Sequence, residues 1–167
     1  MVVGGFFAYQ YFVENGSQDQ NQIAGWRTHT SDEYGFEFKY PNNWKLEQLG
    51  YGTVLKSPDF DYLDAEIDSK VLKGSWVTIR KSYTKFNSVR EYLGDDYAYI
   101  KNAKDIKVDN VYGLEFYYSW ESPEKLFTEL IKDHYLYLIM FEGVGEERED
   151  KDYPVVKEII STFKFTK

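Results

Sequence analysis

Apolar and polar residues alternate along many short segments of this chain. In residues 34–40, four aromatic residues alternate with glycine, glutamate and lysine, which gives an extended segment one apolar and one polar face. Comparable segments, rich in aromatic and β-branched residues, cover 44–48, 53–56, 75–83, 106–108, 114–120, 126–131 and 135–141. Turn residues lie between several of them, most clearly at 132–134. Because the connections are mostly short, we expect these strands to pair antiparallel.

Two other segments have the apolar spacing of a helix. Residues 89–100 follow Asn87 and Ser88, either of which can cap a helix. The second helix is expected to begin after Asp152, with Pro154 in its first turn and apolar residues at positions 156, 159, 160 and 163. Each apolar stripe must be buried against a sheet. The sequence therefore predicts an α+β fold with a central antiparallel sheet flanked by helices, an α/β/α sandwich.

The N-terminal part of the chain differs from the rest. Residues 1–13 are almost entirely apolar, but they are too few to span a membrane, which takes about 20 apolar residues. Residues 14–25 form a polar linker, and the α+β domain occupies 26–167. We interpret 1–13 as the remnant of a membrane anchor, which places the domain at the extracytoplasmic face of a membrane. The alternative is an ordinary N-terminal element that docks on the domain.

Three segments of the domain resemble the PsbP-like family, named for an extrinsic subunit of the oxygen-evolving photosystem. Residues 34–44 (YGFEFKYPNNW) are similar to the opening pattern of the family, and residues 111–118 (VYGLEFYY) to its second glycine-containing strand. Residues 133–143 and 155–165 resemble its late hairpin and closing helix. The resemblance implies a central antiparallel sheet with helices on both sides. It also implies a binding or assembly role, because catalysis is not the norm in this family.

Composition narrows the partners and the chemistry. The net charge is −8, and the 20 Lys and Arg residues are interspersed with acids, so nucleic acid is not an expected partner. The chain has no cysteine, which excludes disulfides, thiolate metal sites and cysteine nucleophiles. We expect a protein partner or a small ligand, with membrane association through the N-terminal segment.

Catalytic motifs are not found in the sequence. His29 and His134 have no neighbouring residues that suggest a base–nucleophile pair, and neither a nucleophile elbow nor a phosphate-binding loop occurs. We therefore predict a domain that is not an enzyme and has no cofactor. An enzyme with an unrecognised carboxylate site is the alternative.

One acidic segment is a candidate metal site. Residues 58–69 contain Asp59, Asp61 and Asp64, followed by two further acids. Clustered carboxylates repel one another, and Ca²⁺ relieves that repulsion. The spacing departs from the EF-hand loop, because no glycine stands at the sixth position and Lys70 stands at the twelfth. The alternative is a solvated loop.

Aromatic residues make up 19% of the chain, including 16 Tyr and 12 Phe. Most of them suit the core and rim of a sheet. Those near predicted loops and strand ends are candidates for a ligand platform: Trp26, Tyr51, Tyr62 and Trp76. A carbohydrate- or peptide-binding module that uses such exposed rings is the second functional hypothesis.

Overall fold

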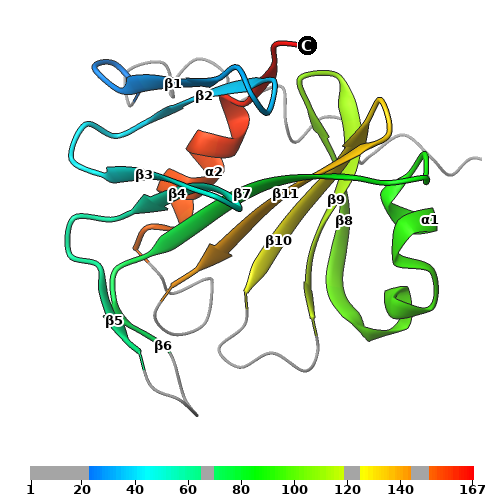
Figure 1. Ribbon diagram of the computed structural model, residues 1–167. Helices are drawn as coiled ribbons and strands as arrows, with labels where there is room; N and C mark the ends of the chain where they lie inside the picture. Colours follow the sequence, from blue (N-terminus) through cyan, green and yellow to red (C-terminus); the bar gives the residue numbers. More distant parts are fainter. Residues whose placement is uncertain (1–22, 65–69, 119–124, 144–150) are drawn as a thin grey trace, which may run out of the picture.

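The computed structural model of the protein describes residues 23–64, 70–118, 125–143 and 151–167 (Figure 1). Its centre is a seven-stranded sheet in which all neighbouring strands pair antiparallel. In spatial order the strands are β3 (Lys45–Leu49), β4 (Gly52–Lys56), β7 (Trp76–Tyr83), β11 (Tyr135–Glu142), β10 (Leu126–Lys132), β9 (Val111–Tyr118) and β8 (Ile100–Val108). The predicted antiparallel sheet is confirmed.

Two smaller antiparallel sheets accompany the large one. The first contains β1 (Arg27–Ser31), β2 (Phe36–Tyr40) and β12 (Lys164–Phe165), with β2 in the middle. The second is a hairpin of β5 (Asp61–Leu63) and β6 (Lys70–Lys73), which extends away from the body of the protein in Figure 1. The alternation predicted for β2 is confirmed, because Phe36, Phe38 and Tyr40 are buried.

The helices are short. Helix α2 (Tyr153–Ser161) begins with Pro154 in its first turn, as predicted. The helix predicted over 89–100 is shorter: α1 (Val89–Leu93) ends at Gly94, and a 3₁₀ helix follows (Gly94–Tyr99). Gly94 has φ +50° and ψ −123°, a backbone conformation that glycine tolerates and that cannot continue the helix, and Asp95 and Asp96 have low helix propensity.

Apolar side chains form two clusters. Residues from α2 and β2 pack with Leu126 and Leu130 of β10 in the larger cluster, whereas Val89 and Leu93 of α1 pack with Phe127 in the smaller one. Alternate residues of a strand point to opposite faces, so the two clusters lie on opposite faces of the sheet. The helices nevertheless cover the sheet less completely than the predicted α/β/α sandwich implies. The main contacts of α1 with strands are to β9 and β10, at one side of the sheet.

The tightest turns use residues in the left-handed conformation. Asp133 and His134 join β10 to β11 with φ of +51° and +64°, and Asp109 and Asn110 join β8 to β9 with φ of +44° and +66°. Two positive φ values in succession belong to the type I′ turn that suits the twist of a hairpin. The hairpin predicted at 132–134 is therefore confirmed.

The anchor predicted at 1–13, and most of the linker, lie outside the described residues. Within the ranges that the structure describes, no helix is long and apolar enough to cross a membrane.

Candidate functional site

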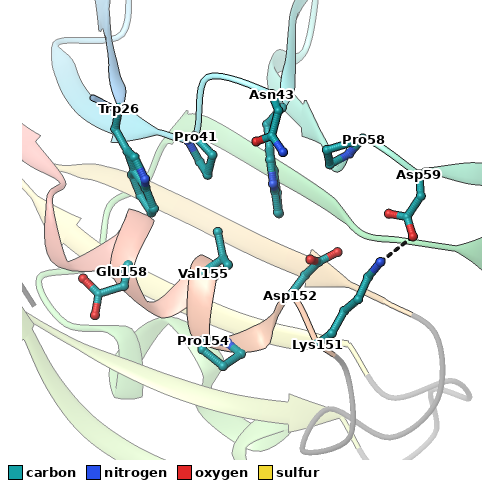
Figure 2. Close-up of a pocket in the computed structure, with 11 residues that line it drawn as sticks. Trp26, Pro41, Asn43, Pro58, Asp59, Lys151, Asp152, Pro154, Val155 and Glu158 are labelled. Atoms are coloured by element: carbon teal, nitrogen blue, oxygen red, sulfur yellow. Dashed lines mark hydrogen bonds and ion pairs between the residues drawn. The ribbon is translucent and has the colours of Figure 1, made fainter. Parts of the chain in front are cut away.

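A cleft of about 580 Å³ opens between the start of α2, the segment before β1 and the loops that follow β2 and β4 (Figure 2). Volumes of roughly 300–1,000 Å³ are usual for small-molecule sites. Four separate segments of the chain contribute to it. The lining residues are Trp26, Pro41, Asn43, Trp44, Pro58, Asp59, Lys151, Asp152, Pro154, Val155 and Glu158.

One end of the cleft is mainly apolar, with Glu158 beside Trp26 as its charged residue. Figure 2 shows Trp26 and Pro41 on one side, facing Val155 and Pro154 of α2 on the other. Trp44 is 5% exposed and belongs to the core, whereas Trp26 is only partly buried. The Asn42 side-chain amide donates to the backbone oxygen of Gly25, which ties the segment before β1 to the turn after β2. This contact positions the Trp26 ring beside the turn.

The other end is polar and held by a chain of hydrogen bonds. Lys151 donates to Asp59 Oδ2 at 2.5 Å, and Ser57 Oγ donates to Asp59 Oδ1 at 3.1 Å. Ser57 Oγ in turn accepts the backbone N–H of Ser75 at 2.8 Å, and Ser75 Oγ donates to Asp152 Oδ2 at 2.9 Å. The end of β4 and the start of β7 are thereby joined to the start of α2, and three members of this chain, Asp59, Lys151 and Asp152, line the cleft.

Gly74 makes this arrangement possible. Its φ is +66°, and a Cβ atom added there would lie 2.2 Å from Ser57 Oγ and 2.8 Å from Asp59 Oδ1. Both the backbone conformation and the space therefore require glycine.

The charges of the polar end are set by pairing. The hydrogen bond from Lys151 lowers the pKa of Asp59 below its ordinary value, so Asp59 is an anion paired with a cation at neutral pH. Asp152 is buried and is bonded to Ser75. An apolar wall combined with an exposed ion pair is suited to binding and orienting a ligand that has one apolar and one polar side.

Neither histidine lines this cleft. His29 lies in β1, with its Nε2 2.8 Å from the Gln48 amide nitrogen and its ring 5.3 Å from that of Phe38. Burial lowers the pKa of His29. His134 is exposed in the β10–β11 turn.

The three aspartates of the predicted metal site are not gathered around one point. Asp59 is paired with Lys151, Asp61 is opposite Lys73 in the β5–β6 hairpin, and Asp64 follows β5. The two further acids of that loop lie outside the described residues. Within the described ranges, no group of three or more acidic or histidine side chains could hold a metal ion. Calcium binding remains a prediction.

The four residues of the predicted ligand platform are divided among three places. Trp26 lines the cleft, and the Tyr51 ring lies 4.8 Å from the guanidinium carbon of Arg80. Tyr62 and Trp76 do come together, with their ring centroids 5.6 Å apart. Phe60, which the prediction omitted, completes their cluster at 5.7 Å from Trp76. All three rings are partly buried, so the cluster also fastens the hairpin to β7.

Sequence reasoning missed most of the cleft. Trp44 belongs to the motif at 34–44, but nothing in the sequence indicated that it would lie near α2. From the sequence, Lys151 is expected in a charged loop and Asp152 at the start of a helix, with no partner predicted for either. Their partners Asp59 and Ser75 are 92 and 77 positions away in the chain.

Comparison with known proteins indicates the fold. No protein-family model matches the chain, and no curated protein sequence matches it. The structure is similar to the solution structure of cyanobacterial PsbP (CyanoP) from Synechocystis sp. PCC 6803, with a TM-score of 0.53 and 14% sequence identity over 86% of this chain and 94% of that one. It is also similar to a crystal structure from Bacteroides thetaiotaomicron VPI-5482, with a TM-score of 0.52 and 14% identity. That match covers 84% of this chain and 48% of the other.

The chain therefore has a PsbP-like fold, as its three motifs predicted. At 14% identity the likeness extends to the fold and no further.

Proposed function

We propose that this chain is a non-enzymatic binding or assembly domain of PsbP-like fold, held at the outer face of a membrane by its N-terminal segment. The observation that carries the proposal is the cleft, in which an apolar wall around Trp26 faces the Asp59–Lys151 pair. The sheet, with a short helix on each face, acts as the scaffold that fixes the two walls. A small ligand, or a side chain of a protein partner, enters between them.

The cleft is tested by tryptophan fluorescence and thermal unfolding against a panel of sugars, short peptides, nucleotides and divalent cations. A ligand that binds only the folded protein stabilises it by about 2.7 kcal/mol at a hundredfold excess over its dissociation constant. We expect Trp26→Ala to abolish the shift, and the control Tyr51→Ala, whose ring lies outside the cleft, to preserve it. If a ligand produces the same shift in Trp26→Ala as in Tyr51→Ala, its binding site lies outside the cleft.

The membrane part of the proposal is tested separately. The full chain, expressed with its N-terminal segment, should fractionate with membranes, and removal of residues 1–13 should release it. If both forms stay in the aqueous fraction, residues 1–13 do not by themselves hold the domain at a membrane.

The cluster of Phe60, Tyr62 and Trp76 favours a second candidate function, a carbohydrate- or peptide-binding module. Lys56 Nζ lies 5.5 Å and 5.7 Å from the ring centroids of Phe60 and Trp76, so a cation accompanies the aromatic surface. A glycan or peptide bound there should quench Trp76, and Tyr62→Ala should remove the effect. A hit that depends on Trp26 instead would favour the cleft.

Calcium is the alternative cofactor, with Asp59, Asp61 and Asp64 as its ligands. Binding would require Asp59 to exchange Lys151 for the ion. Calorimetric titration with Ca²⁺ should therefore give more heat in Lys151→Met if the site exists, and no heat in either protein if it does not.

A further inference from the structure

Three lysines from distant parts of the chain meet at one end of the large sheet. Lys81 is in β7, Lys132 ends β10, and Lys167 follows β12. The Nζ of Lys132 donates to a backbone oxygen of Lys167 at 2.8 Å, and the Nζ of Lys167 donates to the backbone oxygen of Asp32 at 2.5 Å. This grouping contrasts with a chain whose net charge is −8.

Lys81 has no carboxylate partner within the described ranges. Its Nζ donates to the backbone oxygen of Tyr34 at 2.9 Å and lies 4.2 Å and 5.3 Å from the ring centroids of Tyr135 and Tyr137. Burial, followed by the charges of Lys167 and Lys132, lowers the pKa of Lys81. The ammonium group is therefore stabilised by a carbonyl oxygen and by aromatic faces, and it retains donors for a further acceptor.

Among the described residues, Asp133 is the one side-chain carboxylate paired with any of these three lysines. Lys132 is paired with Asp133, whereas Lys167 has no such pair among the described residues. Like charges held close together cost free energy, and an anion that binds between them recovers it.

Two exposed tyrosines border the lysines. Tyr83 is 73% and Tyr135 39% exposed, and their rings meet edge to face with centroids 6.2 Å apart. Exposed tyrosine is enriched at protein interfaces, because the ring supplies contact area at low entropic cost. The adjoining turn holds His134 at φ +64°, a conformation unusual for a residue other than glycine.

We propose that Lys81, Lys132, Lys167, Tyr83 and Tyr135, here called the Lys81 surface, bind a carboxylate-bearing segment of a protein partner. The inference rests on the proposed binding or assembly function and names the chemistry of the partner. Charge complementarity selects an acidic segment. The tyrosine rings extend the contact beyond a single anion, which favours a peptide over free phosphate. The acidic remainder of the domain repels such a segment and so orients it on this end.

The test is an NMR titration of the full chain with a capped hexaglutamate peptide, with inorganic phosphate and hexalysine as parallel probes. Hexaglutamate should shift the resonances of residues 81–83, 132–137 and 165–167. Lys81→Met/Lys132→Met should weaken the binding about tenfold or more. The matched control Lys104→Met/Lys107→Met removes two lysines from β8 and should change the affinity less than about twofold.

Three outcomes would overturn the proposal: no shifts with peptide at about 1 mM, equal weakening in both double variants, or the same shifts with phosphate at the same concentration. The comparison requires Lys81→Met/Lys132→Met to be folded. Lys81→Arg is a second variant that does not depend on this: it keeps the charge and should retain binding. Trp26→Ala should retain it too. Trp26→Ala should therefore abolish ligand binding in the cleft and leave hexaglutamate binding at the Lys81 surface unchanged. A failure of either proposal can thus be told apart from a failure of the other.

Discussion

Ser75 donates its hydroxyl proton to Asp152 Oδ2 at 2.9 Å, and the two residues are 77 positions apart in the chain. Both are buried. Ser75 precedes β7 and Asp152 precedes α2, so the bond joins the end of the sheet to the start of the helix that forms one wall of the cleft. A hydrogen bond to a buried carboxylate contributes more to the free energy of unfolding than a hydrogen bond to an exposed one. The shape of the cleft therefore depends on the network that surrounds Ser75.

Gly74→Ala should break that network. The new methyl group would meet Ser57 Oγ and Asp59 Oδ1, and alanine would also have to adopt φ +66°. We expect a loss of about 3 kcal/mol in the free energy of unfolding, measured by urea denaturation. Gly94→Ala is the matched control, because Gly94 has φ +50° but no atom within 4 Å of the added Cβ. Because its ψ of −123° lies outside the left-handed helical region, alanine there should cost about 2 kcal/mol from the backbone alone. Equal losses in the two variants would show that the space around Gly74 does not matter.

The sequence predicted the parts of the fold that depend on local patterns. The alternation of Phe36 and Phe38, the turn at Asp133 and the Pro154 start of α2 follow from chemistry within a few residues, and the structure confirms them. The same reasoning overestimated the helix after Ser88. It gave the apolar spacing of residues 89–100 more weight than the glycine and two aspartates at 94–96, which favour a helix end.

The cleft could not be predicted in the same way. Pairing of Asp59 with Lys151 depends on how the β4–β5 connection and the start of α2 are folded together, and no spacing in the sequence encodes that. The predicted aspartate cluster illustrates the converse. Asp59 and Asp61 are near in sequence, but Asp61 lies in a strand opposite Lys73, and Asp59 is bonded to Lys151.

Lys157→Met should destabilise the contact between α2 and the sheet. Lys157 is paired with Glu115 of β9, whose side chain is only 5% exposed. Removal of the lysine would leave a buried carboxylate without its cation, at a cost of about 2 kcal/mol in thermal or urea unfolding, less than for a fully buried pair because Lys157 is 30% exposed.

A matched control is available in the pair of Lys164 and Glu37, which are 3.8 Å apart with side chains 64% and 34% exposed. Lys164→Met should cost less than about 0.5 kcal/mol. Addition of Glu115→Gln to Lys157→Met should recover part of the lost stability. If the double variant is no more stable than Lys157→Met alone, the cost does not come from the unpaired charge.

His134→Gly should stabilise the protein. His134 holds φ +64° in the β10–β11 turn, where glycine adopts the same conformation without a steric cost. We expect a gain of about 0.5–1 kcal/mol in the free energy of unfolding, reduced by the greater freedom of glycine in the unfolded chain. His134→Ala keeps the steric cost and should give no gain. Destabilisation by glycine would mean that the imidazole makes a contact that outweighs the strain.

Glu129 should make the stability fall as the pH rises from about 5 to 8. It lies in β10, 4% exposed, and its Oε2 has no hydrogen-bond partner in the part of the chain that the structure describes. Burial raises the pKa of Glu129 to about 7 from 4.5. Between these two values the folded protein holds a proton that the unfolded chain has released, so folding stability decreases with pH. The shift corresponds to about 3 kcal/mol, fully lost above the pKa of the folded state.

The measurement is urea unfolding at several pH values in the wild type and in Glu129→Gln, whose side chain stays neutral. His29 works in the opposite direction, because a lowered histidine pKa reduces stability as the pH falls below 6.5. The difference between the two proteins cancels that contribution. It should favour the variant increasingly as the pH rises from about 5 to 7 and level off above that. Tyr92 of α1, whose own pKa is raised by burial and then by the charge of Glu129, does not titrate in this range. A difference that stays constant from pH 5 to 8 would show that Glu129 ionises at the same pH in the folded and unfolded states, and that its burial is relieved by a partner or by water.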